Sequence, residues 1–192
     1  MTNVTIFGDG NMGSAIADVL TAGGATVDHI TTADNGAGTV SGDIVILAVP
    51  YPALASIVRT YGDELAGKIV VDITNAVNFE TFDSLTVPAD SSAAAELAAA
   101  LPSSKVLKAF NTNLAPTLTA KTVGPHPTTV LIAGDDAEAK AELAAAVTSG
   151  GVQAVDAGSL RRARELEAQG FLQVGLALTE KVGWTGGFAV VR

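Results

Sequence analysis

Three glycines within six residues, close to the amino terminus, constrain this chain more than any other feature. Gly8, Gly10 and Gly13 form the pattern G-x-G-x-x-G between the β-branched run VTIF and the helical run SAIADVL. In that context the first glycine permits a tight turn, the second lets a pyrophosphate approach the backbone, and the third lets helix and strand pack closely. The phosphates would lie at the helix N-terminus, where free N–H groups and the helix dipole favour negative charge. The pattern predicts a dinucleotide-binding domain, and a purely structural glycine turn is the alternative.

Runs of aliphatic and β-branched residues recur between helical patterns, as expected for parallel strands joined by crossover helices. The runs DIVILAV and KIVVDI are apolar at successive positions, which is typical of strands covered by helices on both faces. We therefore expect an α/β fold, a Rossmann-type, doubly wound, mostly parallel sheet with a small C-terminal helical cap. The expected strands are residues 4–7, 26–30, 44–49, 69–73, 106–109, 129–133 and 152–155. The expected helices are residues 11–22, 52–61, 92–101, 137–147 and 159–182.

The link between the second and third strands, residues 31–43, is unusually short. A parallel crossover with its helix needs a dozen or more residues. Because the segment TTADNGAGTVSGD is rich in Gly, Asp and Asn, it predicts a loop or a single turn in place of that helix. This loop would border the adenosine end of a bound dinucleotide.

Length and charge restrict the function further. With 192 residues, the chain is expected to form one domain over residues 1–192, with residues 159–192 as the cap. A net charge of −9 and scattered basic residues argue against nucleic-acid binding. No apolar run reaches the roughly 20 residues of a membrane span, and no export signal is recognised, so we expect a cytoplasmic protein. The absence of cysteine excludes disulfides and thiolate catalysis.

The end of the second strand decides which dinucleotide is preferred, since an acid there binds the ribose hydroxyls of NAD. The sequence at this point is His29, Ile30, Thr31 and Thr32, with no acid at the strand end. Two hydroxyls are available to a 2′-phosphate, but no Arg or Lys is present and Asp34 is close. NADP is favoured, NAD stays open, and the two threonines can also simply begin a loop.

Ligands of open α/β sheets lie beyond the carboxyl ends of the strands, so residues directly after each strand are site candidates. Polar or turn-forming residues follow the third, fourth and fifth strands, and turn formation alone is the alternative for each. The candidates are Ala48, Val49 and Pro50, then Thr74 and Asn75, then Ala109, Phe110, Asn111 and Thr112.

Several catalytic patterns are not found in the sequence. There is no Ser-His-Asp arrangement, no HExxH, and at these strand ends no paired carboxylates and no Lys or His acid–base pair, and no metal site is expected. His29 and His126 are interpreted as structural. Hydride transfer fits this residue set, because it depends mostly on positioning.

The ordered motifs GDGNMG, DIVILAVPYPAL, GKIVVDITN, PADSSAAAELAAALPSSKVLKAFNT, AGDDAEAK and VDAGSLRRARELE cover most of the chain. In these the chain resembles the coenzyme F420-dependent NADP oxidoreductase family, and it is also similar to the reductase domain of the Steap metalloreductases. The resemblance implies NADP(H) at the glycine turn and hydride exchange with a second redox cofactor or small acceptor, such as coenzyme F420 or a flavin.

Site residues are carried over from the resemblance position by position. It implies that Gly8, Asp9, Gly10, Asn11, Met12 and Gly13 hold the pyrophosphate, with Ala48, Val49 and Pro50 beside the ribose. It further implies that Thr74, Asn75, Ala109 and Phe110 lie near the nicotinamide, and that Asn75, Asn111 and Thr112 face the acceptor. Family members usually carry Ser-Arg after the second strand. Thr31 and Thr32 stand there in this chain, and the lost arginine weakens the prediction of NADP preference.

The C-terminal run GFLQVGLALTEKVGWTGGF resembles an apolar helix followed by a glycine-rich turn. It is interpreted as a cap over the acceptor, a seam of a homodimer or plain core, and Trp184 and Phe188 can supply aromatic surface to a flat ring. The leading hypothesis is an NADPH-dependent reductase of a deazaflavin, flavin or similar small acceptor. The rivals are a non-catalytic NADP(H)-sensing protein and a dehydrogenase of a small hydroxy or imino acid.

Overall fold

The computed structural model describes residues 2–78 and 80–191, so the expected domain limits at residues 1 and 192 lie outside the described residues. The strands are β1 (Asn3–Phe7), β2 (Thr26–Ile30), β3 (Ile44–Leu47), β4 (Ile69–Asp72), β5 (Lys105–Lys108), β6 (Thr122–Val123), β7 (His126–Pro127), β8 (Thr129–Gly134) and β9 (Gln153–Gly158). The α-helices are α1 (Asn11–Ala22), α2 (Leu54–Leu65), α3 (Ala93–Ala100), α4 (Ala115–Ala120), α5 (Ala137–Ser149) and α6 (Ala163–Leu178), with 3-10 turns η1 (Thr32–Asp34), η2 (Tyr51–Ala53) and η3 (Leu160–Arg162).

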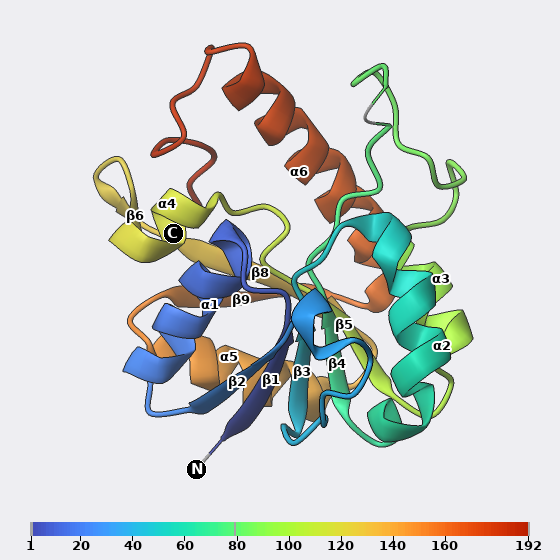
Figure 1. Cartoon of the computed structure of the whole chain (residues 1–192). Coiled ribbons are helices and arrows are strands. Elements are labelled where there is room, and N and C mark those ends of the chain that lie inside the picture. Colours follow the sequence, from blue (N-terminus) through green and yellow to red (C-terminus); the bar gives the residue numbers. More distant parts are fainter. Residues whose placement is uncertain (1, 79, 192) are drawn as a thin grey trace.

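Seven of these strands form one sheet in the order β2-β1-β3-β4-β5-β8-β9 (Figure 1). The pairs from β2 to β5 are parallel, β8 runs antiparallel to β5, and β9 is parallel to β8. The direction of winding reverses between β1 and β3, because β2 lies on one side of β1 and β3 on the other. A ligand crevice is expected at such a switch point, beyond the carboxyl ends of the strands.

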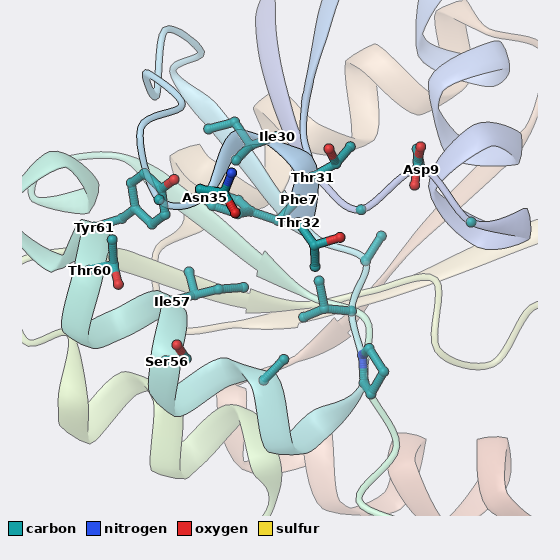
Figure 2. Close-up of a pocket in the computed structure, with 17 residues that line it drawn as sticks. Phe7, Asp9, Ile30, Thr31, Thr32, Asn35, Ser56, Ile57, Thr60 and Tyr61 are labelled. Carbon is teal, nitrogen blue, oxygen red and sulfur yellow. The ribbon is translucent and has the colours of Figure 1, made fainter.

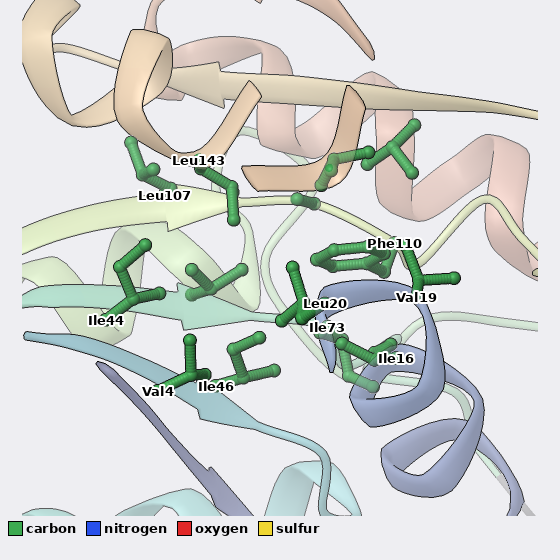
Figure 3. Packing of buried hydrophobic residues seen from close by; sticks show 14 of the residues in the cluster. Val4, Ile16, Val19, Leu20, Ile44, Ile46, Ile73, Leu107, Phe110 and Leu143 are labelled. Carbon is green, nitrogen blue, oxygen red and sulfur yellow. The ribbon is translucent and has the colours of Figure 1, made fainter. Parts of the chain in front are cut away.

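Helices cover both faces of the sheet, as the continuous apolar runs predicted. Alternate residues of β3 point to opposite faces, and all four are fully buried. Ile44 and Ile46 pack in one cluster with residues of α1, α4 and α5 (Figure 3). Val45 and Leu47 pack in the other with residues of α2, α3 and the first turn of α6. The predicted doubly wound α/β fold is therefore confirmed.

All seven predicted strands are present, with small shifts at their ends. The link between β2 and β3 contains only η1, so the predicted loss of a crossover helix is also confirmed. The short helix α4 and the hairpin β6–β7 were not predicted, and α6 ends at Leu178 rather than at residue 182. Among the described residues, no helix is long and apolar enough to cross a membrane.

Candidate functional site

The glycine turn between β1 and α1 leaves no space for side chains at its first and third glycines. Gly8 has a φ of +98°, and a Cβ there would lie 2.4 Å from the carbonyl oxygen of Ala48. A Cβ on Gly13 would lie 2.4 Å from the carbonyl oxygen of Gly8. Both positions therefore require glycine for the close approach of helix and strands.

Gly10 differs from these two, because its φ is −67° and no heavy atom lies within 4 Å of a Cβ placed on it. Any residue can adopt this backbone conformation, so the fold itself does not require glycine here. A side chain would instead project into open space at the start of α1, which has no side-chain cap. The uncapped N–H groups and the open approach fit a dinucleotide pyrophosphate.

A cavity of about 600 Å³, here called the β2 cavity, opens beside this turn at the ends of β1, β2 and β3 (Figure 2). Part of α2 forms its other wall, through Ser56, Ile57 and Thr60. The predicted residues that line it are Gly8, Asp9, Gly10, Thr31, Thr32, Ala48, Val49 and Pro50. The end of β2 and the glycine turn therefore meet in one concave site.

Two further cavities continue from the β2 cavity along the sheet edge. The β4 cavity, of about 340 Å³, is lined by the predicted residues Gly10, Asn11, Met12, Gly13, Ala48, Val49, Pro50, Thr74 and Asn75. The β5 cavity, of about 470 Å³, is lined by the predicted residues Asn11, Met12, Asn75, Phe110 and Asn111. Neighbouring cavities share lining residues, so the three adjoin one another along the strand order β2-β1-β3-β4-β5, and this row of cavities is called the groove.

Two asparagines from different strand ends form a hydrogen-bonded pair in the β5 cavity. The Nδ2 of Asn111 donates to Oδ1 of Asn75 at 2.9 Å and to the carbonyl oxygen of Leu166 at 2.8 Å. In return, Nδ2 of Asn75 donates to the carbonyl oxygen of Asn111 at 3.1 Å. The pair joins the ends of β4 and β5 to α6 and gives the groove a fixed polar floor.

Other predicted residues lie elsewhere. The side chain of Ala109 is fully buried in the core, and Thr112 is buried with its carbonyl oxygen accepting from Nε2 of Gln173. Neither residue lines the three cavities. The predicted aromatic Trp184 lines the β5 cavity and is 49% exposed, so it is not a core residue.

A buried charged cluster that was not predicted from the sequence lies at the ends of β4 and β5. Lys108 ends β5 and Asp72 ends β4, and their Nζ and Oδ2 lie 2.9 Å apart. The same Nζ lies 2.8 Å from Oε1 of Glu167 on α6, and all three side chains are fully buried. Adjacent strands in register bring the first two together on the α3 face. The third comes from a helix distant in sequence.

This buried cluster lies behind the groove and orders its wall. Nζ of Lys108 donates to the carbonyl oxygen of Thr74, and Oδ1 of Asp72 accepts from the Thr74 backbone N–H at 2.7 Å. Glu167 accepts from the backbone N–H groups of Ala93 and Ala94 at the start of α3. Burial raises the pKa of Glu167, and the ammonium of Lys108 opposes that rise. The cluster holds the loop after β4 in place, and its three side chains do not line the three cavities.

Asp34, which the sequence places close to the end of β2, is hydrogen-bonded back to that strand end. The turn η1 folds back so that Oδ2 of Asp34 accepts from the backbone N–H of Thr31 at 2.6 Å and from its hydroxyl at 3.1 Å. The Thr31 hydroxyl in turn accepts from the backbone N–H of Ala33. This reciprocal cap carries a carboxylate back to the strand end.

Tyr51 borders the β4 cavity from the end of β3. Its hydroxyl donates to Oε2 of Glu96 at 2.5 Å. That hydrogen bond, followed by burial and by the charge of Glu96, raises the pKa of Tyr51 to about 12. The phenol is therefore neutral over the physiological range.

Comparisons with known proteins agree with this geometry. The family model described as NADP oxidoreductase, coenzyme F420-dependent, matches residues 28–76. The chain is 34% identical over 159 residues to the F420-dependent NADP reductase of Methanocaldococcus jannaschii, covering 80% of this chain and 70% of that protein. It is 37% identical over 133 residues to metalloreductase STEAP3 of Rattus norvegicus, covering 67% of this chain but only 25% of that protein.

Solved structures share the fold over most of their length. A candidate F420-dependent NADP reductase of Arthrobacter sp. FB24 superposes with a TM-score of 0.84 at 22% identity, over the whole of both chains. The hypothetical protein SMa0349 of Sinorhizobium meliloti superposes with a TM-score of 0.70 at 31% identity, covering 83% of this chain and 86% of that one. The chain therefore belongs to the family of coenzyme F420-dependent NADP oxidoreductases and is an NADP-dependent oxidoreductase.

Proposed function

We propose that this protein binds NADPH along the groove and reduces a flat redox ring, a deazaflavin or a flavin, in the β5 cavity. The observation that carries the proposal is the row of three adjoining cavities from the end of β2 to the end of β5. A dinucleotide is elongated, and a groove that starts beside an open helix N-terminus suits its adenosine, pyrophosphate and nicotinamide in that order.

The lining of each part suits a different portion of the cofactor. The β2 cavity, with Thr31 and Thr32, would take the adenosine, and the backbone at Gly10 would face the pyrophosphate. The β4 cavity, with Pro50 and Asn75, would take the nicotinamide end. The space that a side chain at Gly10 would fill supports this assignment, because it is the place where the diphosphate must approach.

The β5 cavity has the surface expected for an aromatic acceptor. Trp184 forms part of its wall, together with Leu114, Pro116 and Val174. Pockets for small molecules are largely apolar, with a few fixed polar groups that set orientation. The hydrogen-bonded pair Asn75 and Asn111 supplies such groups at the boundary between the β4 and β5 cavities.

The reaction needs little chemistry from the protein. A bound NADPH would supply a hydride to the acceptor ring, and the remaining proton would come from water. The residues of the groove would hold the two rings in contact, and Met12, Ile73 and Val174, which line both the β4 and the β5 cavity, would limit the access of water between them. No side chain has to donate or remove a proton.

The test is oxidation of NADPH by the purified protein, followed at 340 nm without oxygen, with coenzyme F420, FMN, FAD and riboflavin each as acceptor. We expect saturable turnover with at least one of these rings. Tight NADPH binding with no turnover across the set would contradict a reductase and favour the non-catalytic sensing role. Failure to bind NADPH or NADH at all would contradict the assignment of the groove.

A further inference from the structure

Asp34 lies at the end of β2 in space although it lies four residues beyond Ile30 in sequence. The turn η1 returns its carboxylate to within 2.6 Å of the Thr31 backbone nitrogen. Thr31 lines the β2 cavity, and its hydroxyl donates to the same carboxylate oxygen. Asp34 does not itself line the β2 cavity, but its carboxylate is held directly behind the cavity-lining Thr31, close to the strand end where NAD-binding sheets carry an acid.

No cation faces this carboxylate across the cavity. Among the described residues that line the β2 cavity there is no Lys and no Arg, and the polar side chains beyond the glycine turn are Thr31, Thr32, Asn35, Ser56, Thr60 and Tyr61. Arg59 is exposed on α2 and is not part of the lining. His29 lies outside the lining as well, and its Nδ1 is hydrogen-bonded to the carbonyl oxygen of Gly8.

The side chains that line the cavity beyond the glycine turn offer a 2′-phosphate only neutral donors, and some of these already have partners. The hydrogen of the Thr31 hydroxyl is already donated to Asp34, and Nδ2 of Asn35 donates to the carbonyl oxygen of Ala33. A phosphate that accepted a bond from Thr32 would lie close to a full negative charge without a balancing cation. A ribose 2′-hydroxyl, in contrast, can donate to a carboxylate.

We propose that Asp34 is a specificity-determining residue which lets this protein take NADH at least as readily as NADPH. The inference rests on the proposed function, because it requires the dinucleotide to lie in this groove with its adenosine in the β2 cavity. It adds that the repulsion between Asp34 and a 2′-phosphate removes the preference for NADPH that a cation would provide.

The test is calorimetric titration of the full chain with NADH and NADPH, for the wild type, Asp34→Asn and the control Asp90→Asn. Asparagine keeps the oxygen that caps η1 and removes only the charge. Asp90 is exposed in a loop and does not line the β2 cavity, so its substitution makes the same change in net charge elsewhere.

We expect wild-type dissociation constants for NADPH equal to or larger than those for NADH. Asp34→Asn should lower the dissociation constant for NADPH by about three- to tenfold relative to that for NADH. Asp90→Asn should leave the ratio of the two dissociation constants unchanged.

A second measurement uses the wild type alone, in case the variant does not fold. Adenosine 2′,5′-bisphosphate and AMP differ only by the 2′-phosphate, and each is titrated in competition with NADH. We expect AMP to compete at least as well as the bisphosphate. A wild type that binds NADPH tighter than NADH, beyond the error of the titration, or an Asp34→Asn ratio equal to that of the wild type, overturns the role of Asp34. Binding of neither dinucleotide instead refutes the proposed function itself.

Discussion

The ammonium nitrogen of Lys108 lies 2.9 Å from a carboxylate oxygen of Asp72, and both side chains are fully buried at the ends of neighbouring strands. With Glu167 at 2.8 Å from the same nitrogen, one buried cation faces two carboxylates. Removing the cation would leave both carboxylates without their charge partner in a place that water does not reach. Such a loss is far more costly than the loss of an exposed ion pair.

We predict that Lys108→Met lowers the free energy of unfolding by about 3–5 kcal/mol. The matched control is Lys105→Met on the same strand, where the ion pair with Asp136 is partly exposed at 3.3 Å. Lys105→Met should lower the free energy of unfolding by less than about 1 kcal/mol. Urea denaturation of both variants, followed by circular dichroism, measures the difference. Equal losses for the two variants would contradict the structural role of the buried cluster.

Gly10→Val should abolish cofactor binding and leave the fold intact. The valine meets no heavy atom of the protein within 4 Å of its Cβ, but it fills the approach to the helix N-terminus. We expect NADPH affinity to fall by at least about a hundredfold, with a melting temperature within about 3 °C of the wild type.

Two other glycines serve as controls for this variant. Gly13→Ala should destabilise the fold by about 1–3 kcal/mol, because its Cβ would overlap the carbonyl oxygen of Gly8. Gly175→Ala in α6 also meets nothing within 4 Å and should be neutral or slightly stabilising. Unchanged NADPH affinity in Gly10→Val would mean that the turn is only structural.

The Tyr51 phenol should ionise late in a pH titration. Its folded-state pKa of about 12 exceeds the ordinary value of 10.0, mainly because it donates a hydrogen bond to Glu96. The stabilisation from the neutral phenol is therefore complete below pH 10 and is lost as the pH rises through about 12. Absorbance at 295 nm should show this late transition, and Tyr51→Phe should remove it. Glu96→Gln should move it towards pH 10, and a transition unaffected by Glu96→Gln would contradict the assigned cause.

Trp184 should contribute to acceptor binding and not to NADPH binding. The loss of a contact between two aromatic rings weakens binding by about 0.5–1.5 kcal/mol. Trp184→Leu should therefore raise KM for the acceptor by about two- to twelvefold. Phe188→Leu is the control, because Phe188 is exposed on the same segment but does not line the β5 cavity. Steady-state kinetics and NADPH titration of both variants separate the two effects. A weaker NADPH affinity in Trp184→Leu would contradict this placement.

The main sheet could be predicted because its strands are continuous apolar runs, and such runs are buried wherever the chain places them. The short helix α4 could not be predicted. Its segment APTLTA has only six residues, a proline near the start and no clear periodicity. The antiparallel direction of β8 could not be predicted from the sequence either, because strand direction is set by the path of the intervening chain rather than by the strand residues.

The site was predictable where a residue's role depends on its immediate neighbours. Gly8, Gly10 and Asn75 follow strands and line the groove for that reason. The partners of Lys108 were missed because Glu167 is 59 positions away and reaches it only after α6 packs on α3. Asp34 was recognised as close to the end of β2, but its hydrogen bonds to Thr31 were not foreseen, because they depend on the reciprocal cap of a single turn.

The attachment of α6 to the sheet bears on how this scaffold can diversify. Glu167 joins the helix to α3 and to Lys108, and a Cβ on Gly170 would collide with the carbonyl oxygen of Asn111 at 2.5 Å. Mutations of Glu167 or Gly170 would therefore harm folding before they could alter substrate choice. The segment 179–191 beyond it carries Trp184 and has a hydrogen bond from Phe188 to Gln173. A lineage that acquires a new electron acceptor would be expected to change these terminal residues and to keep Glu167 and Gly170, which attach α6 to the sheet.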